Sequence, residues 1–259
     1  MQSTFFTVQL ASHGFIVVAP DHEGDTLRHL LDEGDIVISS TADSFFDRPL
    51  DVSFLLNELE KPNDDPLFQM MDLDRVGVAG HSFGALTAFR SAGFDARIDA
   101  VLAHTPVGIG LVELGLEVPV ADFGIPVMIQ AGGMDRTLPA DMHAVSVWDD
   151  MRAPAYFLML NEAGHFTFSD LCILDVETID AALEEIDASN VLTDGCGEDN
   201  ISPARAFPVI RHYSIAFFNR WLRGSEATDS FFVPLHDLRV DDVSLAESEG
   251  FFEQVLTSP

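Results

Sequence analysis

Basic residues are scarce in this chain. Lysine and arginine together number 13, with Lys61 as the single lysine, whereas aspartate and glutamate number 43, so the 259 residues carry a formal net charge of −30. Proteins bind nucleic acids by neutralising phosphates with lysine and arginine, and basic segments bind anionic membranes in the same way. The composition therefore excludes nucleic acid as a partner and argues against an anionic membrane surface. Two interpretations of the acidity stay open: an aid to solubility, or adaptation to a saline habitat in which salt screens the self-repulsion.

Long apolar runs are also missing. No segment reaches the roughly 18 uncharged apolar residues that a membrane-spanning helix needs, so no stable membrane span is expected. The first residues, MQSTFFTVQLASHG, lack the basic start and long apolar core of a signal peptide. Secretion or export to the periplasm would therefore need a signal upstream of Met1, and without one the expected location is the cytoplasm.

Cysteine occurs only at Cys172 and Cys196, too few for a disulfide framework and without metal-ligand spacing. The two could form one bridge, worth about 3 kcal/mol by loop-closure entropy, or stay separate buried thiols. The sequence has no HExxH, no P-loop and no GxGxxG after a strand. The acidic loop 194–200 has oxygen ligands but lacks the EF-hand spacing. We therefore expect neither a metal nor a cofactor.

Short apolar runs alternate with helical patterns along the chain. Strands are predicted at 15–19, 75–79, 100–103, 126–129 and 155–160, and helices at 48–59, 83–91, 139–150, 175–187 and 207–222. Continuous apolar strands are typical of a parallel sheet buried on both faces, and the alternation predicts an α/β fold. Residues 1–224 are predicted to form this domain, with an acidic helix–loop insertion at about 171–206. An acidic C-terminal extension would follow at 225–259.

The strongest motif is Gly80-His81-Ser82-Phe83-Gly84, which matches G-x-S-x-G. The apolar run RVGVA leads into it and a helical pattern, GALTAF, follows, which is the strand–turn–helix setting of a nucleophile elbow. Ser82 is therefore the candidate nucleophile. The backbone N–H of Phe83, at the start of a helix, is a candidate oxyanion donor.

A serine hydroxyl needs a base to remove its proton, and in this arrangement an acid and then a histidine follow the serine in the chain. Asp135 lies in a glycine-rich turn after one predicted strand, and His165 follows the next. Both positions fall at the carboxyl edge of the sheet, where active sites of open parallel sheets gather. His22, His81 and His104 compete as the base, but none combines this chain order with a position just after a strand.

The segment LASHGFIVVAPDH (10–22), the elbow GHSFGA and the runs GGMDRTLP and GHFTFSDLC resemble α/β-hydrolases. Within that superfamily they resemble the dienelactone hydrolase and platelet-activating-factor acetylhydrolase type. Cutinase-like polyester hydrolases are similar in pattern. The likeness covers about residues 3–224. It implies an α/β-hydrolase fold, a mostly parallel sheet flanked by helices. It also implies a cofactor-free serine esterase with Ser82, Asp135 and His165 as its triad, acting on short or medium acyl esters or acetylated phospholipid-like esters.

The family places further strands, and a His-Gly loop that supplies a second oxyanion donor, before the segment with which this chain begins. The chain is therefore expected to be truncated and to lack these N-terminal strands. Loss of one oxyanion donor typically costs about a hundred- to a thousand-fold in rate. A hydrolase of polyester or lipid surfaces and an inactive fragment are the alternatives, and the sequence leaves the oligomeric state open.

Overall fold

The structure, a computed structural model, describes residues 2–22, 38–108, 124–149, 151–152, 154–174, 194–232, 243–248 and 253–256. Its centre is a six-stranded sheet in the order β1-β2-β3-β4-β5-β6. The strands are β1 (Val76–His81), β2 (Ile98–His104), β3 (Val127–Gly132), β4 (Ala155–Leu160), β5 (Val243–Ser248) and β6 (Glu253–Leu256). The first four pair in parallel, and β5 and β6 add antiparallel strands beyond β4.

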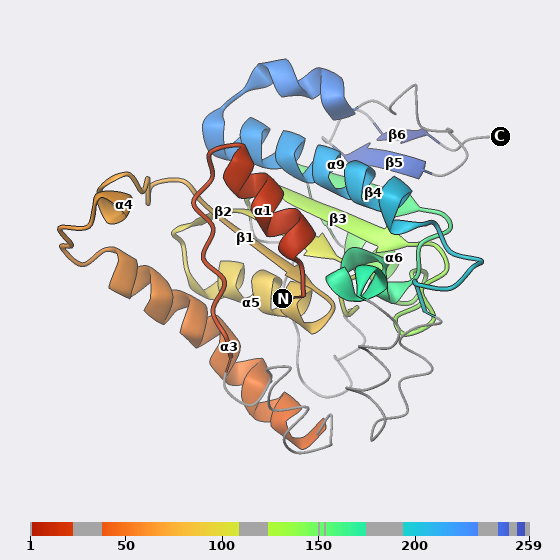
Figure 1. The fold of residues 1–259 in the computed structure, drawn as a ribbon, viewed down its shortest axis with the longest axis horizontal. Coiled ribbons are helices and arrows are strands. Elements are labelled where there is room, and N and C mark those ends of the chain that lie inside the picture. The colour runs from red at the N-terminus through yellow and green to blue at the C-terminus, as the bar shows by residue number, and fades with distance from the viewer. Residues whose placement is uncertain are drawn as a thin grey trace.

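Helices cover both faces of the sheet (Figure 1). The α-helices are α1 (Thr4–Ser12), α3 (Ile38–Leu59), α4 (Pro66–Gln69), α5 (Phe83–Phe94), α6 (Ala144–Asp149) and α9 (Pro203–Arg223). The described residues also include three short 3-10 helices, η3 (His165–Phe168), η4 (Asp170–Ile173) and η5 (Glu226–Phe232). None of the helices in these described segments has both the length and the apolar character that crossing a membrane requires.

Two buried clusters form the core, one on each face of the sheet. Ala100 and Leu102 of β2 pack with α1 and α9, whereas their neighbours Val101 and Ala103 pack with α3 and α5. This division follows from the two-residue period of a strand, which turns successive side chains to opposite faces. An apolar strand without polar alternation is therefore what a sheet covered on both faces requires, as predicted.

The register of the sheet aligns its carboxyl edge. His81 at the end of β1 pairs with His104 at the end of β2, and His104 pairs with Gln130 near the end of β3. The turns that leave β1, β3 and β4 therefore emerge along one edge. This edge receives the three segments in which candidate catalytic residues were predicted.

The long helix α9 is defined by its ends. Pro203 occupies its first turn, where the missing N–H costs nothing, and Gly224 ends it in the left-handed region at φ 66°. Its buried face, which includes Ile210, Tyr213 and Phe217, lies against the sheet beside α1. The predicted helix at 207–222 is confirmed with slightly wider bounds.

The strand predicted at 15–19 is wrong. Residues 15–22 form no strand, and Ile16, Val17 and Val18 are between 36% and 44% exposed. Apolar, β-branched residues predict burial, but a strand also needs a neighbouring backbone to complete its hydrogen bonds. In the described part of the chain β1 pairs only with β2, so residues 15–19 have no such neighbour there.

Other boundaries differ less. The helix expected at 48–59 is the second half of the longer α3, and the one expected at 139–150 shrinks to α6, because residues after Pro139 form turns first. The acidic helix predicted at 175–187 lies outside the described residues. The segment predicted as a C-terminal extension contributes β5 and β6 to the sheet.

Candidate active site

Ser82 lies in a strained turn between β1 and α5. Its φ of 58° and ψ of −120° fall in a region that residues with a side chain rarely adopt. The turn is crowded, because a Cβ on Gly80 would lie 2.1 Å from the carbonyl oxygen of Gly84. The N–H of Ser82 donates to the carbonyl oxygen of His104 at 2.9 Å, which ties the turn to the end of β2. Strain of this kind persists where the surrounding structure enforces it, often at functional sites.

The start of α5 faces the same turn. The Ser82 side chain makes no capping hydrogen bond to the helix, so its hydroxyl is not used to satisfy the first backbone N–H groups. Phe83 is the first residue of α5, where free N–H groups and the helix dipole favour negative charge. The Phe83 N–H therefore lies at the end of the helix where a negative charge is favoured.

Asp135 and His165 form a buried pair. Asp135 follows β3 and His165 begins η3 after β4, and the distance from Oδ2 of Asp135 to Nδ1 of His165 is 2.8 Å. Their side chains are only 1% and 3% exposed, respectively. The other carboxylate oxygen, Oδ1, accepts from the N–H of Leu138 at 2.6 Å. A carboxylate that accepts from Nδ1–H leaves Nε2 of His165 as the nitrogen able to take a proton.

His81 joins the serine turn to the histidine turn. Its Nε2 donates to the carbonyl oxygen of His165 at 2.9 Å, and the two imidazole rings lie 4.7 Å apart between centroids. Its Nδ1 accepts from the side-chain amide of Gln2 at 2.7 Å. Burial, and next the proximity of His165, hold the pKa of His81 well below its usual range. The imidazole of His81, the residue before Ser82, is thus uncharged and in contact with His165.

The remaining competing histidines are engaged elsewhere. His22 pairs with Asp51 at 2.7 Å between Nδ1 and Oδ2. His104 is 2% exposed, its ring packs near those of Phe6 and Phe168, and burial lowers its pKa to about 3. Neither is bonded to a carboxylate at the carboxyl ends of β3 and β4, where His165 meets Asp135.

The N-terminus of α1 is held against this edge. The carboxylate of Asp170, just after η3, accepts from the N–H groups of Thr4 and Phe5, and the Asp170 N–H donates to the carbonyl oxygen of Gln2 at 2.8 Å. An anionic side chain at a helix N-terminus satisfies free N–H groups and complements the dipole. These contacts place Gln2 where it reaches His81.

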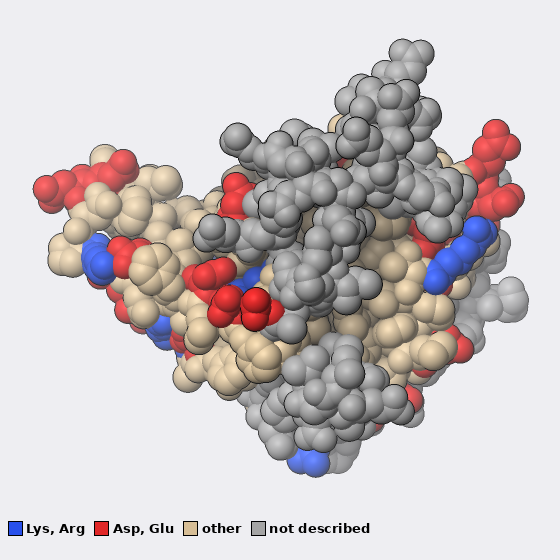
Figure 2. Space-filling view, turned by 90° about the horizontal axis from the view of Figure 1, so that it is seen from below, with Lys and Arg blue, Asp and Glu red and all other residues tan. Residues whose placement is uncertain are grey.

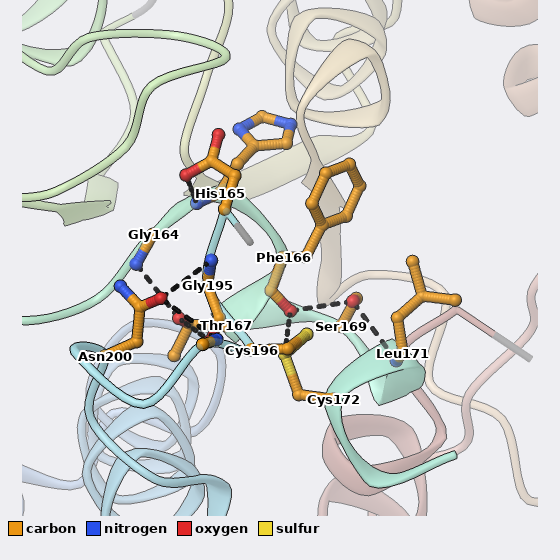
Figure 3. The surroundings of a disulfide bond; sticks show 12 residues. Gly164, His165, Phe166, Thr167, Ser169, Leu171, Cys172, Gly195, Cys196 and Asn200 are labelled. Carbon is orange, nitrogen blue, oxygen red and sulfur yellow. Dashed lines mark hydrogen bonds between the residues drawn. A yellow bond between two sulfur atoms is a disulfide. The ribbon is translucent and has the colours of Figure 1, made fainter. Parts of the chain in front are cut away.

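The structure joins Cys172 and Cys196 in a disulfide, with their Cα atoms 4.9 Å apart. Figure 3 shows this bond beside the His165 turn, with Gly195 and Asn200 packed against Gly164 and Thr167. Of the two alternatives that the sequence left open, the structure therefore contains the bridge. No group of three or more potential metal ligands occurs among the residues that the structure describes.

Sequence reasoning missed Asp194. The sequence shows only an acidic loop without EF-hand spacing, yet Asp194 is only 3% exposed and accepts hydrogen bonds from the N–H of Arg136, next to Asp135, and from the N–H of His165 itself. The one available signal was its position two residues before Cys196. An acidic residue next to glycine in a polar loop otherwise resembles any solvated aspartate.

Comparison with known proteins is consistent with this geometry. The family model described as PETase, PET hydrolase-like, matches residues 2–173. Among solved structures, a ferulic acid esterase from Streptomyces cinnamoneus is similar with a TM-score of 0.56 and 26% sequence identity over 78% of this chain. The chain spans 55% of the length of that esterase. No curated protein matches. The extent of the family match, together with the parallel sheet and its flanking helices, shows that the chain belongs to the PET hydrolase-like family and has the α/β-hydrolase fold.

Proposed function

We propose that this protein is a serine carboxylic ester hydrolase that forms an acyl-enzyme on Ser82. The observation that carries the proposal is the buried Asp135–His165 hydrogen bond beside the strained Ser82 turn. Family membership and the likeness to a ferulic acid esterase support the same reaction class. His81, which contacts His165 directly, connects the two parts of the site.

In the proposed mechanism, Nε2 of His165 takes the proton of the Ser82 hydroxyl as Oγ bonds to the ester carbonyl carbon. Asp135 holds the imidazole in the required tautomer and stabilises the imidazolium. The Phe83 N–H donates to the oxyanion. The intermediate collapses by breaking the bond to the alcohol oxygen, which leaves with the proton from His165. Water then attacks the acyl-enzyme by the same sequence of proton transfers and releases the acid and free Ser82.

The proposed substrates are neutral esters of short or medium acyl chains, including acetylated phospholipid-like esters. A net charge of −30 disfavours strongly anionic substrates at long range, although salt weakens this effect. Phe166, whose ring centroid lies 5.1 Å from that of His165, contributes an aromatic surface next to the site. Aromatic and aliphatic side chains of this kind are typical walls of an acyl or aryl pocket.

Polyester hydrolysis is the second candidate, and the match to the PET hydrolase-like family favours it. The two candidates share the same chemistry but differ in access, because a polymer chain needs an open cleft. Release of soluble product from a polyester film, compared with turnover of a soluble nitrophenyl ester at equal enzyme concentration, separates them. A protein that hydrolyses only the soluble ester would contradict the polyester proposal.

The decisive experiment is covalent labelling with a fluorophosphonate, followed by peptide mass spectrometry. We expect the label on Ser82, no label in Ser82→Ala, and slow labelling in Asp135→Asn. A fall in kcat of about 10⁴ in that last variant follows from the wrong histidine tautomer. Absence of both label and turnover in the folded protein would refute the proposed activity and favour a non-catalytic role.

The Cys172–Cys196 bridge also supports a proposed location in an oxidising compartment, such as the periplasm or the medium. Reducing compartments keep most thiols of mesophilic proteins free. Thiol alkylation of the protein isolated from its native cells, before any reduction, tests this directly. Two free thiols in that material would contradict the proposed location.

A further inference from the structure

We infer that Asp194 is a positioning residue that holds the Asp135 turn and the His165 turn at the separation their hydrogen bond requires. This inference rests on the proposed function, because it assigns Asp194 a role in the same reaction. The carboxylate of Asp194 is bonded to Arg136, Thr137 and the backbone of His165. It acts through the two loops that it joins.

The carboxylate is bonded to the acid loop through residues that directly follow Asp135. The N–H of Arg136 donates to both oxygens at 3.1 Å. The N–H and the hydroxyl of Thr137 donate to Oδ2 at 2.7 and 2.6 Å. Three donors from consecutive residues thus converge on one carboxylate, which fixes the path of the chain as it leaves Asp135.

The same residue is bonded to the histidine loop. Oδ1 of Asp194 accepts from the backbone N–H of His165 at 3.1 Å, and the Asp194 carbonyl oxygen accepts from the N–H of Phe166 at 2.8 Å. Asp194 therefore contacts the backbone of the base itself on one side and the residues next to the acid on the other. It thus adds a second link between the two loops, which are also joined by the bond from the Met134 N–H to the carbonyl oxygen of Ala163 at 2.9 Å.

The backbone around Gly195 packs closely against the backbone of the His165 turn. A Cβ on Gly164 would lie 2.5 Å from the nitrogen of Gly195, and one on Gly195 would lie 2.5 Å from the nitrogen of Thr167. Gly195 also has a φ of 126°, which favours glycine. The two backbones thus pack in direct contact, so a displacement of Asp194 would move the His165 turn with it.

The segment that carries Asp194 is itself anchored. Cys196 is bonded to Cys172, which lies after the His165 turn, and the side-chain oxygen of Asn200 accepts from the N–H groups of Gly195 and Gly197 at 3.1 and 3.2 Å (Figure 3). A disulfide and a local hydrogen-bond network therefore hold a rigid base for the Asp194 carboxylate.

The contacts require a charged carboxylate. Burial opposes ionisation of Asp194, but hydrogen bonds from Thr137, Arg136 and His165 prevail and lower its pKa. Every partner on the carboxylate is a donor, so the amide of an asparagine would place N–H groups against N–H groups. Asp194→Asn therefore keeps the size of the side chain and one acceptor oxygen, but replaces the other oxygen by an NH₂ donor that faces donors.

The test compares Asp194→Asn with Asp199→Asn, the same substitution at an exposed residue of the same loop. Thr137→Val, which removes only the hydroxyl donor, is a milder second variant. Two quantities are measured: the kcat and KM of ester hydrolysis, and the ring tautomer of His165 from ¹⁵N-histidine NMR. Circular dichroism reports whether each variant is folded.

We expect kcat of Asp194→Asn to fall about 100-fold with KM within twofold, because misplacement of the catalytic geometry acts on kcat. The His165 tautomer should become mixed. Thr137→Val should show a smaller change in the same direction, and Asp199→Asn should match the wild type.

A folded Asp194→Asn with wild-type kcat and a single His165 tautomer would overturn the inference. If that variant does not fold, Thr137→Val decides, and its wild-type kcat and tautomer would overturn the inference equally. A wild-type protein without turnover would refute the proposed function alone, since the tautomer measurement needs no activity.

Discussion

The two glycines that flank Ser82 in the G-x-S-x-G motif differ in the space around them. The G-x-S-x-G pattern requires a glycine at both positions, but in the structure only one of them has no room for a side chain. A Cβ on Gly80 would collide with the backbone of Gly84, whereas a Cβ on Gly84 would have nothing within 4 Å. The first glycine is therefore a requirement of the turn, and the second is a position within α5 that a larger residue can occupy.

This difference yields a matched pair of variants. Gly80→Ala should force the turn open, lowering the free energy of unfolding by about 1–3 kcal/mol and reducing esterase activity at least about 100-fold. Gly84→Ala should retain activity and gain up to about 1 kcal/mol, because alanine favours a helix over glycine. Urea denaturation and ester hydrolysis measure both. Equal effects of the two substitutions would contradict the explanation.

His104 links burial to the pH dependence of stability. Its pKa is about 3 in the folded protein and 6.5 in an unfolded chain, so the unfolded state binds a proton at higher pH. This group leaves stability unchanged above about pH 6.5, and the free energy of unfolding decreases as pH falls from 6.5 towards 3. The slope from one such group is at most about 1.4 kcal/mol per pH unit.

Replacement of His104 tests this assignment. In His104→Leu the free energy of unfolding should depend less steeply on pH between about 6 and 4 than in the wild type. Its backbone carbonyl, which accepts from Ser82, remains in place. Urea denaturation across the pH range measures both proteins, and parallel curves would assign the acid sensitivity to other groups.

At the scale of elements, periodicity predicted most of the sheet but not its edge. Four strands were predicted from apolar runs: β2, β3 and β4 are buried on both faces, whereas Gly77 and Ala79 of β1 are exposed. The candidates Ser82, Asp135 and His165 were selected by their order after those strands. The segment 15–19 has the same composition but pairs with no strand in the described structure. Asp194 was not predicted because its partners are backbone N–H groups and one hydroxyl in loops far away in the sequence, which a local pattern cannot reveal.

The disulfide should stabilise the element that it closes. Closing the loop between Cys172 and Cys196 is worth about 3 kcal/mol in the unfolded-state entropy model, so Cys172→Ala/Cys196→Ala should lose about that much free energy of unfolding. Activity at low temperature should also fall, because Asp194 loses its anchor. Urea denaturation and turnover of the double variant, compared with the dithiothreitol-treated wild type, measure these changes. Unchanged values in both samples would contradict the prediction.

At the scale of the whole molecule, the main feature is the excess of negative charge. Acidic side chains are distributed over the face seen in Figure 2, with few basic ones among them, as the net charge of −30 requires. Charges of one sign repel one another in the compact state, and salt shortens the range of this repulsion from about 10 Å at 0.1 M to about 3 Å at 1 M. The folded state should therefore be more stable in concentrated salt.

We expect the Tm to rise by about 5 °C or more between low salt and about 1 M NaCl. Screening should give most of the rise at the lower concentrations, whereas an excluded solute such as sucrose stabilises gradually. Differential scanning calorimetry in both series measures the difference. A Tm independent of NaCl would show that the acidity has no bearing on stability and would leave solubility as its explanation.

The short span between Cys172 and Cys196 has a consequence for engineering. The two cysteines are separated by 24 positions in the sequence, yet their Cα atoms are only 4.9 Å apart. Residues 175–193 join these two positions along the chain, so the length of that segment does not set the distance between Cys172 and Cys196. Shortening it to a tight turn, or splicing in a polymer-binding module there, should leave hydrolysis intact as long as the bridge and Asp194 are kept.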